Sequence, residues 1–213
     1  MKTTGSKITT KMTMTTREVE LKLSISSEGY ERLTELMPAK GKTRHQLNIF
    51  FDDAKGTLRE AKWGFRLRRD DGIWFLTAKG PNKKNDGISD REEIECELSE
   101  EKAQELLTGQ VTLSDFSEAP ATHLLASFGD LNLQEWMRFE NLRSVLLWHN
   151  IELELDHSSC GTHHRYELEV ELPMDELLSI RERLEHWLKK NSIFITPSKE
   201  GKLSWAVECS SDS

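Results

Sequence analysis

The segment 17–26, REVELKLSIS, alternates polar and apolar residues without interruption. In an extended strand this alternation places Glu18, Glu20 and Lys22 on one face and the intervening apolar residues on the other. A strand of this kind usually packs its apolar face on a core and exposes its charged face to water. One such strand therefore does not show whether its charged face is exposed to water or enclosed in a site.

The same segregation recurs in other predicted strands. Basic faces are expected in strands 64–69 and 73–80, and acidic or mixed faces in 89–99, 151–156 and 165–172. Rows of like charges repel, and buried unpaired charge costs several kcal/mol, so such faces favour an enclosed site where a ligand neutralises them. The residues on these faces are Arg66, Arg68, Lys79, Arg91, Glu93, Glu95, Glu152, Glu154, Asp156, Glu167, Glu169 and Glu171.

The order of predicted elements indicates a mainly β fold with flanking α-helices. Eight or nine strands, many joined as hairpins, favour an eight-stranded antiparallel closed β-barrel with helices packed outside. In this barrel the charges point into the lumen and the apolar faces lie under the helices. The remaining strands are expected at 45–53, 138–149 and 201–208, and the helices at 28–37, 99–109, 121–136 and 174–191.

The length allows one large domain or two small ones, and composition predicts a disordered segment 1–16 and a loose tail 208–213. A net charge of -8 argues against nucleic-acid binding, and no run approaches the ~18 apolar residues of a membrane span. Three widely spaced cysteines indicate a reducing compartment. We therefore expect a cytoplasmic monomer that binds neither nucleic acid nor a membrane, with a transit role for 1–16 left open.

The residue types suggest what the lumen binds. Aligned carboxylates are suited to hard divalent cations such as Mg2+ or Mn2+. Arginine and lysine clusters are suited to phosphate oxygens, which arginine can bind with two donors. A metal complex of a small-molecule triphosphate would match both kinds of wall. The group Cys160, His163 and His164 also resembles part of a zinc site, but it lies in a predicted hairpin turn without a second ligand pair, which favours a solvated turn.

The ordered set of motifs resembles the CYTH superfamily, also called the triphosphate tunnel metalloenzymes. The leading signature is the E-x-E-x-K strand of Glu18, Glu20 and Lys22. The supporting motifs follow in the family's order over nearly the whole chain, from 17 to about 207. They are FFD at 50–52, the R-x-R of Arg66 and Arg68, Lys79, Arg143 followed by ELELD, the YELEVE strand, and Lys202.

The resemblance implies a metal-dependent hydrolase that binds a triphosphate in the barrel. The implied phosphate-binding residues are Lys22, Arg66, Arg68, Lys79, Arg91, Arg143 and Lys202. The implied metal ligands are Glu18, Glu20, Glu154, Glu169 and Glu171, with Glu93 and Glu95 as further candidates. Lys22, Glu169 and Glu171 are the implied catalytic residues, and the glutamate that orients the attacking water stays open.

Within the superfamily, the segment 139–171 is most similar to the plant-type inorganic tripolyphosphatases, which favours tripolyphosphate as substrate. Thiamine triphosphatase is the alternative, and adenylyl cyclase or a non-catalytic polyphosphate-binding module is less favoured. In thiamine triphosphatases a tryptophan two residues before the first clamp arginine stacks on the thiamine ring. That position is Gly64 here, and strand parity places the neighbouring Trp63 on the opposite face.

Overall fold

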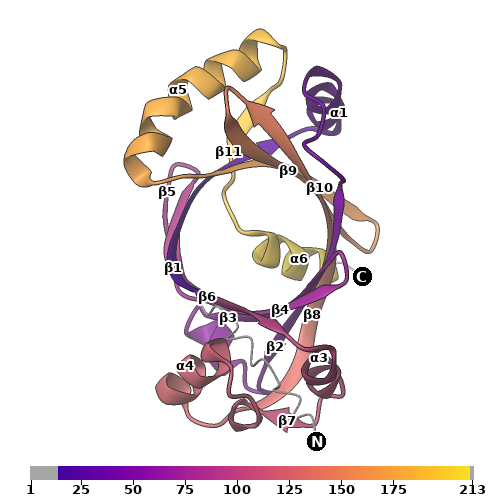
Figure 1. The fold of residues 1–213 in the computed structure, drawn as a ribbon, viewed down its shortest axis with the longest axis vertical. Coiled ribbons are helices and arrows are strands. Elements are labelled where there is room, and N and C mark those ends of the chain that lie inside the picture. Colours follow the sequence, from indigo (N-terminus) through magenta and orange to yellow (C-terminus); the bar gives the residue numbers. More distant parts are fainter. Residues whose placement is uncertain (1–13, 212–213) are drawn as a thin grey trace, which may run out of the picture.

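A computed structural model describes residues 14–211. Within this range eight antiparallel strands close into a ring, which confirms the predicted mainly β barrel with helices outside (Figure 1). The strands follow one another around the ring as β1-β10-β9-β8-β2-β3-β4-β6, and β6 pairs again with β1. Their bounds are β1 Met14–Ile25, β2 Arg44–Asp52, β3 Gly64–Asp70, β4 Ile73–Lys79, β6 Ile88–Leu98, β8 Asn132–Trp148, β9 Ile151–Cys160 and β10 His163–Glu171.

Strand β1 closes the barrel because each half of it pairs with a different neighbour. Its first half pairs with β6, with Glu18 opposite Arg91, and its second half pairs with β10, with Lys22 opposite Glu169. Closure leaves no long edge open to another chain. Three short strands lie beside the ring: β5 Lys83–Asn85 on β6, β7 Val111–Thr112 on β8, and β11 Ile195–Pro197 on β1.

Helices cover the outward apolar faces of the strands on two sides of the barrel (Figure 1). On one side Leu21 and Leu168 belong to a buried cluster with Leu184 of α5, and on the other Leu67 belongs to a cluster with Leu124 of α4. Fully burying one leucine contributes roughly 1.5–3 kcal/mol. No described helix is both long and apolar enough to cross a membrane. The bounds are α1 Ser27–Leu36, α2 Thr57–Glu60, α3 Glu100–Leu107, η1 Leu113–Asp115, α4 Ala119–Phe128 and α5 Met174–Lys190.

The segment 201–208, predicted as a closing strand, instead lies in helix α6, Lys202–Ser211. The prediction was wrong because β1 already has a partner on each side, so the ring has no edge for a further strand. Leu203 and Ala206, three residues apart, lie on one helical face and join an apolar cluster with Phe50 and Phe139. In Figure 1, α6 appears within the outline of the ring.

Other predicted boundaries also shift. The predicted helical stretch 121–136 is helical only to Phe128, because Gly129 adopts a φ of 77° and β8 begins at Asn132. Residues 14–16 of the predicted disordered segment begin β1, and 208–211 of the predicted loose tail belong to α6. The rest of both segments, 1–13 and 212–213, lies outside the described residues.

Candidate functional site

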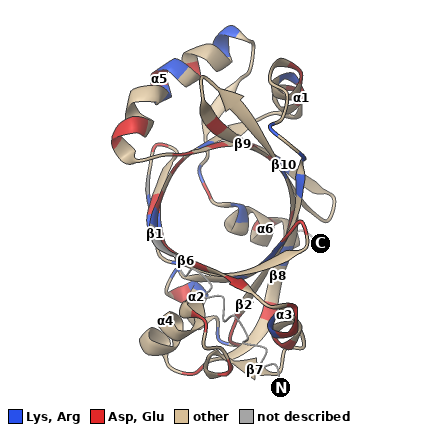
Figure 2. Ribbon diagram, viewed as in Figure 1, with Lys and Arg blue, Asp and Glu red and all other residues tan. Residues whose placement is uncertain are grey.

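The barrel encloses a cavity of about 1140 Å³ with a strongly charged lining. All eight barrel strands and α6 contribute residues to the lining, and Figure 2 shows basic and acidic residues along the ring. The charged faces therefore point inward. All the predicted site residues line the cavity: Glu18, Glu20, Lys22, Arg66, Arg68, Lys79, Arg91, Glu93, Glu95, Arg143, Glu154, Glu169, Glu171 and Lys202.

Three further acids from the same strand faces differ from this set. Asp156 and Glu167 are buried, and both form ion pairs with Lys202 beneath the cavity wall. Glu152 is exposed and pairs with Lys40 instead, because β9 begins at Ile151 and its first residues lie at the rim of the barrel. Alternate side chains of a strand therefore reach the cavity only along the part of the strand that borders it.

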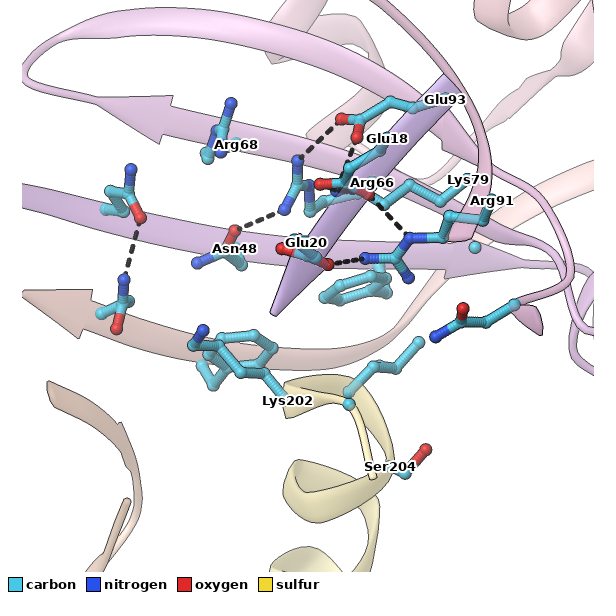
Figure 3. A pocket seen from close by; sticks show the side chains of 18 of the residues that line it. Glu18, Glu20, Asn48, Arg66, Arg68, Lys79, Arg91, Glu93, Lys202 and Ser204 are labelled. Atoms are coloured by element: carbon cyan, nitrogen blue, oxygen red, sulfur yellow. Dashed lines mark hydrogen bonds and ion pairs between the residues drawn. The ribbon is translucent and has the colours of Figure 1, made fainter. Parts of the chain in front are cut away.

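Glu18 organises one wall of the cavity (Figure 3). Its Oε1 accepts from Lys79 Nζ at 2.9 Å, and its Oε2 accepts from Arg91 Nε at 2.8 Å. Lys79 Nζ also lies 2.8 Å from an oxygen of Glu93. Burial alone would raise the pKa of Glu18, but Lys79 and Arg91 outweigh it and hold the pKa well below its usual range. Burial lowers the pKa of Lys79, and its acidic neighbours offset this only in part.

Glu169 organises the wall near α6. Its Oε1 lies 2.8 Å from Lys22 Nζ and 2.5 Å from Lys202 Nζ, and its Oε2 accepts from Arg143 Nη2 at 2.8 Å. Burial would raise the pKa of Glu169, but Lys202, Lys22 and Arg143 hold it well below its usual range. Lys202 reaches this wall from the first residue of α6, so it lies in the barrel lumen although its predicted secondary structure was wrong.

The two arginines of β3 have donors that protein groups leave unused. Arg66 Nη2 and Arg68 Nη2 lie 3.5 and 3.0 Å from Glu95 Oε2. The Nε atom of each arginine is buried and has no hydrogen-bond partner within residues 14–211. Burial, reinforced by the neighbouring Arg68, lowers the pKa of Arg66 to about 10. Both arginines also line the cavity, where a guanidinium group can bind phosphate oxygens with two donors, so they fit an anionic ligand with several acceptor oxygens.

Carboxylates crowd together at Glu154 and Glu171. Burial raises the pKa of Glu171, and the charges of Glu18 and Glu20 raise it further. Burial also raises the pKa of Glu154, despite the nearby Arg143. Crowded carboxylate oxygens are the donors that Mg2+ and Mn2+ prefer. The residues fit such a cation by their chemistry, although no three acidic, histidine or cysteine groups among the described residues form a ready metal cage.

Several polar residues of the cavity were missed by the sequence reasoning. Arg44, Gln46 and Asn48 of β2 and Asn141 of β8 all face it. Asn141 Nδ2 donates to Gln46 Oε1 at 3.0 Å, which links the two strands inside the lumen. The alternation in 44–50 contained the signal, since these β2 residues share a strand face. The amides were overlooked because they carry no charge, and Arg44 because the predicted strand began one residue later.

Two tryptophans also line the cavity. Trp63 precedes β3, so strand parity does not fix its ring, and the expectation that it faces away from the lumen was incomplete. Its ring packs against His123 at a centroid distance of 5.1 Å and still borders the cavity. The second tryptophan, Trp136, forms a cation–π contact with Arg59, whose guanidinium carbon lies 4.3 Å from the ring centroid.

Known proteins are similar to this chain in sequence and in fold. A protein of Methanocaldococcus jannaschii, provisionally named an adenylate cyclase, is 36% identical over 88 residues, which cover 40% of this chain and only 49% of that relative. HpAC1 from Hippeastrum is a proposed adenylyl cyclase with a dominant triphosphatase activity, and its structure is similar to this one with a TM-score of 0.83. The two chains are 26% identical, and the match covers 90% of this chain and 95% of the HpAC1 chain.

A structure from Bacillus halodurans, provisionally assigned as an adenylate cyclase, shares the fold with a TM-score of 0.69 at 23% identity, over 89% of this chain and 97% of its own. The CYTH domain model matches residues 16–194, the part of the chain that forms the barrel and the helices around it. Because this match covers most of the chain, the protein belongs to the CYTH family.

Proposed function

We propose that this protein is a metal-dependent triphosphatase that hydrolyses inorganic tripolyphosphate to diphosphate and phosphate. The observation that carries the proposal is the convergence of arginine and lysine side chains from several barrel strands on one cavity, among them Arg66, Arg68 and Arg143. A linear anion with many oxygens would bind to several of these side chains at once and neutralise part of their charge. The dominant triphosphatase activity of HpAC1 agrees with this proposal.

The proposed chemistry is positioning and charge neutralisation. Arg66, Arg68 and Arg143 would hold the phosphate oxygens while Lys22 and Lys202 balance the charge near Glu169. Water adds to the terminal phosphorus, the bridging P–O bond breaks, and diphosphate and phosphate leave. A fixed array of donors lowers the barrier because it needs no reorganisation during the reaction.

A divalent cation, Mg2+ or Mn2+, would supply further neutralisation of the phosphate charge. Glu171 would be its main ligand, because other carboxylates crowd around it and it forms no ion pair with another described residue. Glu20 and Glu154 lie close enough to contribute oxygens, although they also pair with Lys22 and Arg143. Glu18, Glu93 and Glu95 lie among Lys79, Arg66 and Arg68 and would set the position of those cations.

Thiamine triphosphate is the second candidate substrate. Trp63 and Trp136 both border the cavity, and an aromatic ring there could stack on a heterocycle. The ring of Trp63 already packs against His123 and Phe128, and the ring of Trp136 packs against Arg59 and Phe50. This occupation favours the substrate without an organic group.

The test is phosphate release from tripolyphosphate, thiamine triphosphate and ATP, measured side by side with Mg2+ and with Mn2+, together with an assay for cyclic AMP. The proposal expects the highest kcat/KM with tripolyphosphate. A preference for thiamine triphosphate would give the tryptophans a binding role, and cyclic AMP from ATP would support a cyclase. Binding of tripolyphosphate without release under either metal would identify a binding module instead.

Two variants test the site assignment. Arg66→Ala and Glu169→Ala are each expected to abolish turnover while the protein stays folded, because they remove one phosphate donor and the centre of one ion-pair wall. Arg69→Ala is the matched control, since Arg69 is exposed on the outer face of the same strand. Unchanged activity in both site variants would contradict the assignment.

A further inference from the structure

Arg44 is a cavity residue with no role in the ion-pair walls described above. It begins β2, lines the cavity and is 39% exposed in its side chain. Phe50, where α6 packs, lies six residues further along the same strand, or about 20 Å at roughly 3.3 Å per residue. Arg44 therefore lies toward the end of the cavity that α6 does not cover.

Arg44 pairs with Asp70 but leaves most of its N–H donors without a partner in the described part of the chain. The β2–β8 register places it directly opposite Arg143, and like charges in that position repel. Glu154 lies between the two arginines, but it pairs closely with Arg143 and is 3.9 Å from Arg44 Nη2, too far for a hydrogen bond. Among the described residues, the one hydrogen bond from the five N–H donors of Arg44 goes to Asp70 Oδ2 at 3.0 Å.

A buried polar network holds Arg44 in place. Asp70 Oδ2 also accepts from Gln46 Nε2 at 2.9 Å, and Gln46 Oε1 accepts from Asn141. Asn141 Oδ1 in turn accepts from Ser158 Oγ at 2.9 Å. Apart from Arg44 these side chains are buried. Preorganised donors lose little freedom on binding, so the network favours ligand binding by Arg44 over a mobile surface role.

We propose that Arg44 is a specificity-determining residue that binds a fourth phosphate, so that the site accepts linear tetrapolyphosphate. This proposal rests on the proposed triphosphatase function. The cavity, at about 1140 Å³, exceeds the roughly 300–1000 Å³ of pockets for drug-sized ligands, so it has room beyond a tripolyphosphate. Hydrolysis of tetrapolyphosphate would consume one water, break one bridging P–O bond and yield tripolyphosphate and phosphate.

The experiment compares kcat/KM for tetrapolyphosphate and tripolyphosphate in the full-length protein with Mg2+, and the affinities of both anions by calorimetry in EDTA. The expected result is that Arg44→Gln lowers the tetrapolyphosphate-to-tripolyphosphate ratio by about tenfold, the effect of one charge-assisted hydrogen bond. Asp70→Asn, which weakens the contact that fixes Arg44, should lower the ratio less. Arg69→Gln, on the outer face of β3, should leave it within about twofold.

An unchanged tetrapolyphosphate-to-tripolyphosphate ratio in Arg44→Gln would overturn the proposal, even if the variant lost activity with both anions by the same factor. If the wild-type protein releases no phosphate from either anion, the proposed function fails. In that event the calorimetric ratio still decides whether Arg44 recognises the longer chain. If Arg44→Gln does not fold, Asp70→Asn gives the same test, because Asp70 holds Arg44 without itself binding an anion.

Discussion

Lys202 offers a sharp test of how α6 and the barrel depend on one another. Its ammonium group lies 2.5 Å from Glu169 Oε1, 2.8 Å from Asp156 Oδ2 and 3.2 Å from Glu167 Oε2. All three carboxylates are buried. Lys202→Met keeps most of the side-chain volume but removes the charge, and leaves these acids with fewer cations.

The expected loss can be bounded from the remaining contacts. Removing one partner of a buried ion pair costs about 3–5 kcal/mol. Arg143 still pairs with Asp156 and Glu169, and Arg165 still pairs with Glu167. Because each acid keeps at least one cation, and Glu169 keeps Lys22 as well, we expect the lower bound of about 3 kcal/mol in the free energy of unfolding. For a chain of this size that is roughly 6–12 °C in Tm.

The effect depends on pH with a defined sign. Lys202 and its neighbouring cations lower the pKa values of Asp156, Glu167 and Glu169, against the raising effect of burial. Lowered carboxyl pKa values stabilise the fold above the unfolded-state values of about 4, and this stabilisation is lost as the pH falls. The variant has less of it to lose, so the difference from wild type should be full at pH 7 and smaller at pH 4.

Urea denaturation at both pH values measures this difference, with Lys199→Met as the control because Lys199 is exposed three residues earlier. The control is expected to change stability by less than about 0.5 kcal/mol. A loss below about 1 kcal/mol at pH 7, or a loss of the same size at both pH values, would refute the reasoning that Lys202 neutralises a buried acidic cluster.

Two further predictions concern activity. Burial lowers the pKa of Lys79, so kcat/KM for tripolyphosphate should decline with rising pH before the usual lysine pKa of about 10.4 is reached. Lys79→Arg should move this decline to higher pH. A decline at the same pH in both proteins would exclude Lys79 as its origin. EDTA should abolish phosphate release. Glu171→Gln should raise the Mg2+ concentration for half-maximal release about tenfold, with little change in Tm, because the variant loses the contribution of Glu171 to metal binding. A wild-type Mg2+ dependence in Glu171→Gln would remove Glu171 from the metal site.

Much of the barrel could be predicted because strand parity is a local property. Residues two apart, such as Glu18 and Glu20 or Arg66 and Arg68, lie on one face whatever surrounds them. When many strands each segregate their charges, an enclosed lumen is the arrangement that brings opposite charges together. The same local rule would have found Gln46 and Asn48, had amides been considered along with charges.

The C-terminal segment could not be assigned from its own residues. Leu203 and Ala206 fit a helix through their spacing, while the run 201–208 also fits a short strand. The choice depends on whether the barrel leaves an edge, and on the inward apolar residues Phe50 and Phe139 that receive the helix. Both conditions depend on residues at least 30 positions earlier in the sequence, in β10 and in the more distant β2 and β8.

The sequence by itself therefore determined the barrel, the inward direction of its charges and most of the charged residues that line it. Only the tertiary structure decided which acid pairs with which cation, that Glu18 and Glu169 are the centres of two walls, and that Arg44 keeps unused donors beside its pair with Asp70. The physical reason is that side-chain direction follows from the local backbone, whereas an ion pair depends on the register between strands that are distant along the chain.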